Sequence, residues 1–344
     1  MYIWKSLAGQ GGLRPDIESG SLLSFFPSLD QTMGHLPKHI LVAGGAGFIG
    51  SALTRRLLED GHKVTVVDNL SNGRMKNIPE KVRFIKVDLT EEGAYREFDN
   101  ISFDAVFHLA SQSSGEMSFD NPVGDMKSHL YITFNLLQLS LEKKVSRFMF
   151  ASSTTLYGDP KLFPVNESHS RNPKTYYATG KLACEEYIRF FSNLGLPTTV
   201  FRLPNVYGPG QNLQNKNQGM VSIYLSYILE GQPILVKGPK DRFRDFIYID
   251  DVVDGWLMAL ASPDAIGKTY NMASGKKSTV GQVLDSLKSA CGQPDYPVEF
   301  IGGTPGDQLG MVADISRIQN EIGFKPKVDL QAGLKRMFET EVGK

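Results

Sequence analysis

From His39 onward, short apolar runs alternate with amphipathic stretches of helix length. The runs are apolar throughout, which is typical of strands that are buried on both faces of a parallel sheet. They predict strands at 39–43, 64–67, 82–87, 105–109, 148–151 and 198–202. Between them, apolar residues at helical spacing predict helices at 48–59, 123–142 and 176–193. This alternation predicts an α/β fold with a doubly wound parallel sheet of the Rossmann type.

The pattern loosens after Asn205 into a loop rich in Gly, Pro and Asn and then into mixed segments. We expect a smaller mixed α/β lobe over the carboxyl edge of the sheet, where such folds bind their ligands. A strand and a helix at 246–260 are expected to return to the first domain. The predicted division assigns 38–205 plus about 246–275 to a nucleotide-binding domain, and about 206–245 and 276–344 to the lobe.

Residues 1–37 mix Gly, Pro and Ser with one short apolar patch. We expect them to form an extension outside the fold; a segment that docks on a partner is the alternative. They lack the cationic start and the long apolar core of a signal peptide. No apolar run approaches the ~18 residues that cross a bilayer, so no membrane partner is expected.

The composition argues against several other classes of protein. Lys+Arg and Asp+Glu both count 37, so the basic excess of a nucleic-acid binder is missing. The two cysteines, Cys184 and Cys291, stand far apart, which argues against a disulfide framework and favours a reducing cytoplasm. The six histidines form no HxH or HExxH pair, so no metal site is predicted.

A glycine-rich segment directly follows the first predicted strand. Gly44, Gly47 and Gly50 have a GxxGxxG spacing, which permits a tight turn, close approach of a pyrophosphate and close packing of the next helix. Phe48 and Ile49 lie in the same segment, at the start of that helix. The helix N-terminus offers free N–H groups and a positive dipole end to phosphates. The segment therefore predicts a dinucleotide-binding site.

The ends of the next three strands extend this site. Asp68 ends the second strand, where a carboxylate accepts hydrogen bonds from the adenine ribose and repels a 2′-phosphate. This favours NAD over NADP; the alternative is that Asp68 and Asn69 form a plain turn. Asp88 and Leu89 end the third strand, where we expect the adenine. Leu109 and Ala110 end the fourth strand and are expected to line the NAD channel.

Tyr177 and Lys181 lie four residues apart in the predicted helix 176–193, and so share one helix face. An ammonium beside a phenol stabilises phenolate, and we expect it to lower the phenol pKa from about 10. The phenolate can then remove a proton from a sugar hydroxyl while hydride leaves the same carbon for NAD+. A serine at the end of the fifth strand can relay that proton. Such a pair alone would indicate an exposed amphipathic helix; its position after the glycine-rich segment favours catalysis.

Together these motifs resemble the extended short-chain dehydrogenase/reductase family, in its nucleotide-sugar epimerase branch, from about Lys38 to the C-terminus. The resemblance is carried by GGAGFIG at 44–50, SSTTLYG at 152–158, YATGK at 177–181 and the segments 203–211 and 244–251. It implies NAD as cofactor and a homodimer paired through the long helices. It also implies a nucleotide-diphosphate sugar as substrate, with a UDP-sugar favoured and GDP- or dTDP-sugars as alternatives.

Carried over position by position, the resemblance makes Tyr177 the base, Lys181 its partner and a ribose ligand, and Ser153 the proton relay. Asn205 and Arg244 match positions that bind the diphosphate. For Arg244 the alternative is a salt bridge to Asp250 or Asp251. The remaining residues expected to contact the substrate are Gln112, Ser113, Met220, Val221 and Asp307.

Departures from the family pattern narrow the chemistry. Thr154 and Thr155 stand where relatives that dehydrate or decarboxylate the sugar carry acidic residues. This favours oxidation at C4 and hydride return to the opposite face, a 4-epimerase; a net C4 dehydrogenase or reductase is the alternative. His129 replaces a frequent Asn and is either a satisfied buried histidine or a second proton carrier. Thr304 replaces an Arg, so one diphosphate contact is missing, and Glu116 either faces the sugar or caps a helix.

Overall fold

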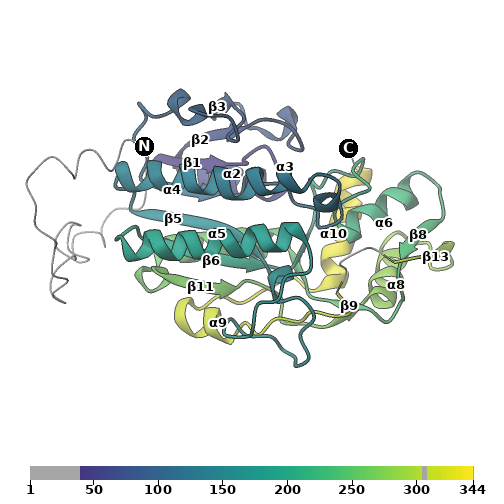
Figure 1. The fold of residues 1–344 in the computed structure, drawn as a ribbon. Helices are drawn as coiled ribbons and strands as arrows, with labels where there is room; N and C mark the ends of the chain where they lie inside the picture. The colour runs from purple at the N-terminus through teal and green to yellow at the C-terminus, as the bar shows by residue number, and fades with distance from the viewer. Residues whose placement is uncertain (1–38, 304–307, 344) are drawn as a thin grey trace, which may run out of the picture. The chain divides into compact units, whose positions relative to one another are not determined.

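The computed structural model describes residues 39–303 and 308–343. The predicted extension at 1–37 and the residues Thr304 and Asp307 lie outside the described residues. A seven-stranded parallel sheet in the order β11-β6-β5-β4-β1-β2-β3 forms the centre (Figure 1). Its strands are β1 His39–Ala43, β2 Lys63–Asp68, β3 Arg83–Lys86, β4 Ala105–His108, β5 Arg147–Ser153, β6 Thr198–Leu203 and β11 Lys268–Asn271. The predicted doubly wound fold is confirmed.

Helices cover both faces of this sheet, and each face has its own core. Ile40 and Val42 of β1 pack in one apolar cluster with α2 (Phe48–Glu59) and α7 (Ile249–Ala261). Leu41 and Ala43 point the other way, into a cluster with α4 (Ile132–Glu142) and α5 (Tyr176–Asn193). Figure 1 shows α4 and α5 side by side over that face. Because successive side chains of a strand alternate between faces, an entirely apolar run serves both cores.

The predicted helix at 123–142 has the right extent but is not regular. It consists of α3 (Pro122–Met126), the π-helical turn η6 (Lys127–Tyr131) and α4. Asn121 caps its start by accepting a hydrogen bond from the Gly124 backbone N–H at 2.9 Å. The helices predicted at 48–59 and 176–193 are confirmed with those bounds.

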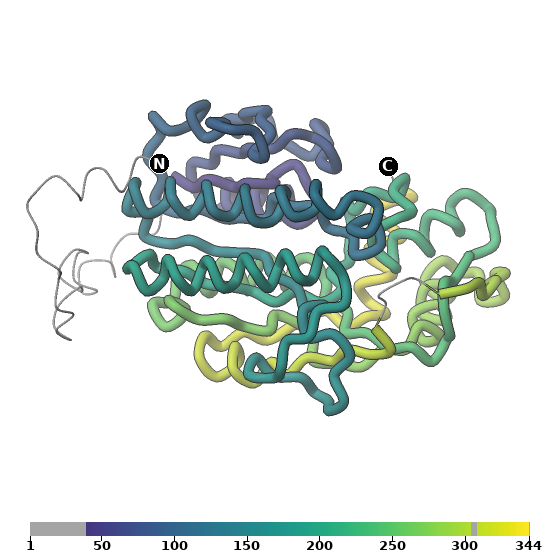
Figure 2. Tube along the Cα trace, viewed as in Figure 1, coloured from purple at the N-terminus to yellow at the C-terminus, as the bar shows by residue number. Residues whose placement is uncertain are grey.

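Short paired strands and four helices make up most of the remaining chain. The strand pairs are β7 Asn205–Tyr207 with β10 Phe246–Tyr248, β8 Ile234–Lys237 with β13 Val298–Ile301, and β9 Phe243–Arg244 with β12 Ser278–Thr279; the helices are α6 Met220–Leu229, α8 Val280–Ala290, α9 Ser316–Ile322 and α10 Leu330–Val342. Figure 2 shows α9, in yellow, beside the β11 edge of the central sheet.

The prediction for 246–260 was right for the helix and wrong for the strand. Helix α7 packs beside α2 on the sheet, as expected. Strand β10, in contrast, pairs with β7 and does not enter the central sheet. The seventh central strand is β11, which pairs with β6. The division between the two domains at the predicted boundaries stays a prediction.

Candidate functional site

A cavity of about 870 Å³ opens at the carboxyl ends of the central strands. This is within the range of sites for small molecules and cofactors. All the predicted site residues that the structure describes line this one cavity, although they come from distant parts of the chain. They are Gly44, Gly47, Phe48, Ile49, Gly50, Asp68, Asn69, Asp88, Leu89, Leu109, Ala110, Gln112, Ser113, Ser153, Tyr177, Lys181, Asn205, Met220, Val221 and Arg244.

The glycine-rich segment connects β1 to α2 with close backbone contacts. Gly44 has φ +83°, and a Cβ there would lie 2.6 Å from the Ala110 backbone nitrogen. A Cβ at Gly50 would lie 2.2 Å from the Gly44 carbonyl oxygen. Gly47 is the N-cap of α2 and makes no side-chain cap bond, so backbone N–H groups of the first turn face the cavity. This cradle fits the pyrophosphate of a dinucleotide.

The acidic residues after β2 and β3 lie along the cradle. The Asp68 carboxylate accepts hydrogen bonds from the backbone N–H groups of Ala46 at 3.0 Å and Leu70 at 2.8 Å. Burial raises the pKa of Asp68, and these two bonds oppose the rise. Asn69 donates to the Asp88 carboxylate at 3.0 Å. Burial would raise the pKa of Asp88, but bonds from Thr90 and Asn69 outweigh it and lower the pKa.

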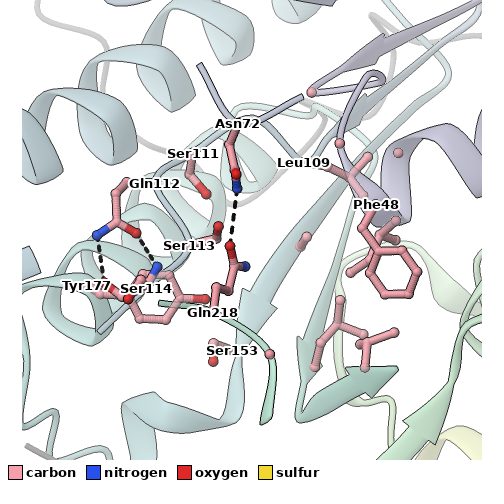
Figure 3. A pocket seen from close by; sticks show the side chains of 18 of the residues that line it. Phe48, Asn72, Leu109, Ser111, Gln112, Ser113, Ser114, Ser153, Tyr177 and Gln218 are labelled. Carbon is pink, nitrogen blue, oxygen red and sulfur yellow. Dashed lines mark hydrogen bonds between the residues drawn. The ribbon is translucent and has the colours of Figure 1, made fainter. Parts of the chain in front are cut away.

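Ser153 at the end of β5 and Tyr177 at the start of α5 lie in this cavity, as Figure 3 shows. Lys181, one turn further along α5, lines the same cavity. The Lys181 ammonium donates to Ser111 Oγ at 3.0 Å and to the Ala151 carbonyl at 2.8 Å. It lies 5.9 Å from the centre of the Tyr177 ring. At the end of β5, Ser153 Oγ accepts a hydrogen bond from the Thr155 backbone N–H at 3.2 Å. The helix brings Tyr177 and Lys181 to one face, as their spacing predicts.

The expected lowering of the phenol pKa is wrong for the chain by itself. Burial raises the pKa of Tyr177 to about 12, and a hydrogen bond with Ser153 only partly opposes this. Burial also lowers the pKa of Lys181 to about 8. The reason is that both groups are shielded from water, and the ammonium is directed at Ser111 and Ala151 rather than at the phenol oxygen.

On the opposite wall, Arg244 donates to the carbonyls of Phe243 at 2.7 Å and Gln308 at 2.6 Å. Asp251, one of the two alternative partners of Arg244, accepts hydrogen bonds from the backbone N–H groups of Lys327 and Val328. The charged groups that act on Asp250 are Arg336, Asp251, Asp254 and Arg56. Burial lowers the pKa of Arg244 to about 10, so the guanidinium is still charged at neutral pH.

Three further residues that were expected near the substrate lie in the cavity wall. The Asn205 amide donates to the Asp245 carbonyl at 3.2 Å. The Gln112 amide bonds to the backbone of Ser114, as Figure 3 shows. Glu116 pairs with Lys237 at 2.7 Å and so joins the loop after β4 to β8. It makes no side-chain cap bond, so the helix-cap alternative for Glu116 is wrong.

A family model described as the NAD-dependent epimerase/dehydratase family matches residues 40–273. The chain belongs to this family. It is therefore an enzyme with NAD as its cofactor, and the predicted resemblance to the epimerase branch is confirmed.

Solved and curated relatives extend over nearly the whole described chain. The UDP-glucose 4-epimerase of Thermotoga maritima, solved with UDP-glucose, is 34% identical with a TM-score of 0.84, covering 89% of this chain and 100% of that one. The UDP-glucose 4-epimerase of Mycolicibacterium smegmatis is 33% identical over 306 residues, 87% of this chain and 97% of that protein. The UDP-glucuronic acid decarboxylase 1 of Xenopus tropicalis is 30% identical over 306 residues, 87% of this chain and 71% of that protein.

Several lining residues of this epimerase-family enzyme were not predicted. Ser111 binds the Lys181 ammonium, and its position directly after Ala110 at a strand end was a usable signal. Asn72 donates to Gln218 at 3.1 Å, a bond between two distant loops that no local pattern indicates (Figure 3). Gln308 reaches the cavity from late in the chain.

Within residues 39–303 and 308–343, no group of three or more His, Cys, Asp or Glu side chains is placed to hold a metal ion. In the same part of the enzyme, no helix is both long enough and apolar enough to span a bilayer.

Proposed function

We propose that this enzyme is a nucleotide-sugar 4-epimerase that retains NAD across turnovers, and that its substrate is a UDP-hexose. The observation that carries the proposal is the meeting of Ser153, Tyr177 and Lys181 in one cavity with the glycine cradle. The relatives that are named UDP-glucose 4-epimerases support the choice of nucleotide and of reaction.

In this proposal the glycine cradle holds the pyrophosphate, Asp68 binds the adenine ribose and Lys181 binds the nicotinamide ribose. Oxidised NAD supplies a hydride acceptor and a positive charge beside the phenol. Tyr177 removes the proton from the C4 hydroxyl, and Ser153 bridges the two oxygens. Arg244 and Asn205 hold the diphosphate, since a guanidinium matches the geometry of phosphate oxygens. The sugar then presents its other face and receives hydride and proton back.

The two threonines that follow β5 favour epimerisation over reactions that need a carboxylate in their place. Thr154 and Thr155 both line the cavity, and neither hydroxyl can act as the carboxylate that dehydration or decarboxylation would need. Lys174 also lines it, but its ammonium is bound to Asp159 at 2.6 Å. These features support epimerisation although a decarboxylase is among the relatives.

The test is conversion of UDP-glucose to UDP-galactose by the purified chain, with UDP-glucuronic acid as the competing substrate. We expect product without added NAD and without net NADH. Tyr177→Phe should abolish turnover while NAD stays bound, and the exposed neighbour change Tyr176→Phe should leave turnover intact. Full activity of Tyr177→Phe contradicts the mechanism, stoichiometric NADH indicates a net dehydrogenase, and CO2 release indicates a decarboxylase.

We also propose a homodimer formed through the outer face of α3, α4 and α5. Large apolar side chains are exposed along these elements, and two of them, Phe134 and Tyr187, pack edge to face. Exposed apolar surface of this kind supports an interface. The exposed side chains are Val123, Met126, Tyr131, Phe134, Tyr176, Tyr187, Phe190 and Leu194.

We also propose a cellular location and a division into two domains. A cytoplasmic location is supported by Cys184 and Cys291, which are both buried free thiols. The predicted domain division is supported by β11, which lies within 246–275 and pairs with β6 of the first domain.

A further inference from the structure

A carboxylate and an imidazole are buried together behind the tyrosine that we propose as base. Asp125 belongs to α3 and His129 to the π-helical turn η6. Their side chains are 1% and 0% exposed, and His129 Nε2 lies 3.5 Å from Asp125 Oδ1. π-helical turns are rare and occur frequently at functional sites. The turn directs the imidazole toward α5.

The imidazole packs directly on the proposed base. The rings of His129 and Tyr177 meet edge to face, with centroids 5.3 Å apart and planes inclined by 67°. A Cβ at Gly180, on the next turn of α5, would lie only 2.8 Å from His129 Cδ2. The glycine within the 177–181 motif therefore makes the room that His129 occupies against the helix.

The pair lacks the partners that a buried charge needs. Among the described residues, neither oxygen of Asp125 nor either ring nitrogen of His129 makes a hydrogen bond of good geometry. The nearby buried acid Glu185 is different, because Arg202 binds it at 2.7 Å. A buried ionised carboxylate without donors is costly, and a proton held between the two side chains removes that cost.

The charges around the pair show what such a proton would do. Asp125 raises the pKa of Tyr177 by its negative charge, after burial as the larger cause. Burial is the largest influence on His129 and its pKa is lowered overall; Asp125 opposes this shift and Lys181 adds to it, so the imidazole depends on Asp125 to hold a proton. The groups that face His129 are thus Asp125 from α3, Tyr177 and Lys181 from α5, and His108 from β4.

We propose that Asp125 and His129 share one proton, on Oδ1 or on Nε2, and that the resulting neutral pair lets Tyr177 ionise for proton transfer. Both are positioning residues, because they act through the tyrosine and do not touch the sugar. The proposal rests on the proposed function of Tyr177. It predicts that the net charge of the pair, not its packing, sets the position of the acid limb, which is the part of the pH profile where kcat/KM rises with pH.

Three variants separate charge from packing, with kcat/KM measured against pH. His129→Gln removes the imidazole that shares the proton, so Asp125 becomes a lone negative charge beside Tyr177 once it ionises, and the acid limb should move up by about one pH unit. Asp125→Asn leaves a neutral pair and should not move the limb upward. The double variant is also neutral and should return the limb to its wild-type position. A structural role predicts the opposite order, with the double variant the most impaired and the limb unmoved.

Spectroscopy on the wild-type holoenzyme tests the proton without relying on turnover. Ring-labelled histidine in NMR should show an imidazolium for His129, or infrared spectra should show a protonated carboxyl band, and Asp125→Asn should remove either signal. Asp251→Asn, which removes a buried acid bound to the Lys327 and Val328 backbone, is the control and should change neither the signals nor the acid limb.

The shared proton is refuted if His129→Gln leaves the acid limb of the pH profile in place, or if adding Asp125→Asn to it does not return the limb to its wild-type position. It is also refuted if neither spectroscopic signal is found. Retained turnover in Tyr177→Phe would instead overturn the proposed function and leave the spectroscopic result standing. The wild-type spectra decide the question even where a variant fails to fold.

Discussion

Replacing Gly50 by alanine should separate the cofactor cradle from the rest of the fold. The added Cβ would lie 2.2 Å from the Gly44 carbonyl oxygen and 2.8 Å from Gly45 Cα, and both are backbone atoms. Neither can rotate away as a flexible side chain could. The start of α2 must therefore move away from the β1 turn.

The size of the effect follows from those contacts. Ordinary van der Waals contact begins at 3.4 Å, so the helix start must shift by about 1 Å, a misplacement that can cost two orders of magnitude at a positioned site. Overpacking of this kind costs about 1–3 kcal/mol of folding free energy. The phosphate-facing N–H groups move with the helix, and we expect NAD affinity to fall at least tenfold, or about 1.4 kcal/mol.

The assay is urea unfolding with and without added NAD, together with the NAD content of the purified protein. Gly61→Ala is the matched control at the other end of α2, because Gly61 has φ +84° but no atom within 4 Å of an added Cβ. It should lose about 1 kcal/mol of stability from backbone strain and keep its NAD. Equal NAD retention in Gly50→Ala and wild type would refute the assignment of this loop to the pyrophosphate.

Three further changes test other parts of the site and the surface. Asp68→Ala should weaken the preference for NAD over NADP, measured as the ratio of dissociation constants; an unchanged ratio removes Asp68 from the ribose. Lys181→Met should abolish turnover yet stabilise the cofactor-free protein by about 1–3 kcal/mol near neutral pH, because burial lowers the pKa of Lys181 to about 8. The gain in unfolding free energy over the wild type, measured by urea unfolding, should shrink as pH rises from about 8 toward 10.5, because there the lysine of the unfolded wild type also loses its proton. Phe190→Glu should convert a dimer to monomers in sedimentation, since Phe190 is 55% exposed on α5; a persisting dimer would place the interface elsewhere.

The sequence predicts the sheet well where burial on both faces makes a run apolar throughout. Strands β1 and β4 come closest to this, and their predicted positions agree with the structure to within one residue. Strand β11 was missed because it lies at the sheet edge and has only Tyr270 and Asn271 buried. The pairing of β10 with β7 depends on the lobe that carries both, and no local pattern encodes that choice.

The positions of the site residues were predictable, but their ionisation was not. Parallel strands end at the same edge of a sheet, so residues after those ends meet there whatever their separation in sequence. Asp68, Ser153 and Ser111 are all placed by this rule. The pKa of Tyr177 depends instead on how closely α5, η6 and β5 exclude water, which is a property of tertiary packing. The π-helical turn that brings His129 against the tyrosine likewise leaves no mark on the apolar periodicity.

The burial of Tyr177 suits the proposed epimerisation, in which the proton taken from the sugar must later be given back to it. Burial raises the pKa of the phenol to about 12 and lowers that of Lys181 to about 8, so both shifts penalise the ionised form. Bound oxidised NAD would supply positive charge that opposes the first penalty. Once protonated, the phenol holds its proton firmly while the sugar presents its second face. A buried phenol that keeps its proton is therefore suited to epimerisation, in which the hydride returns to the carbon and the proton returns to the oxygen that lost it.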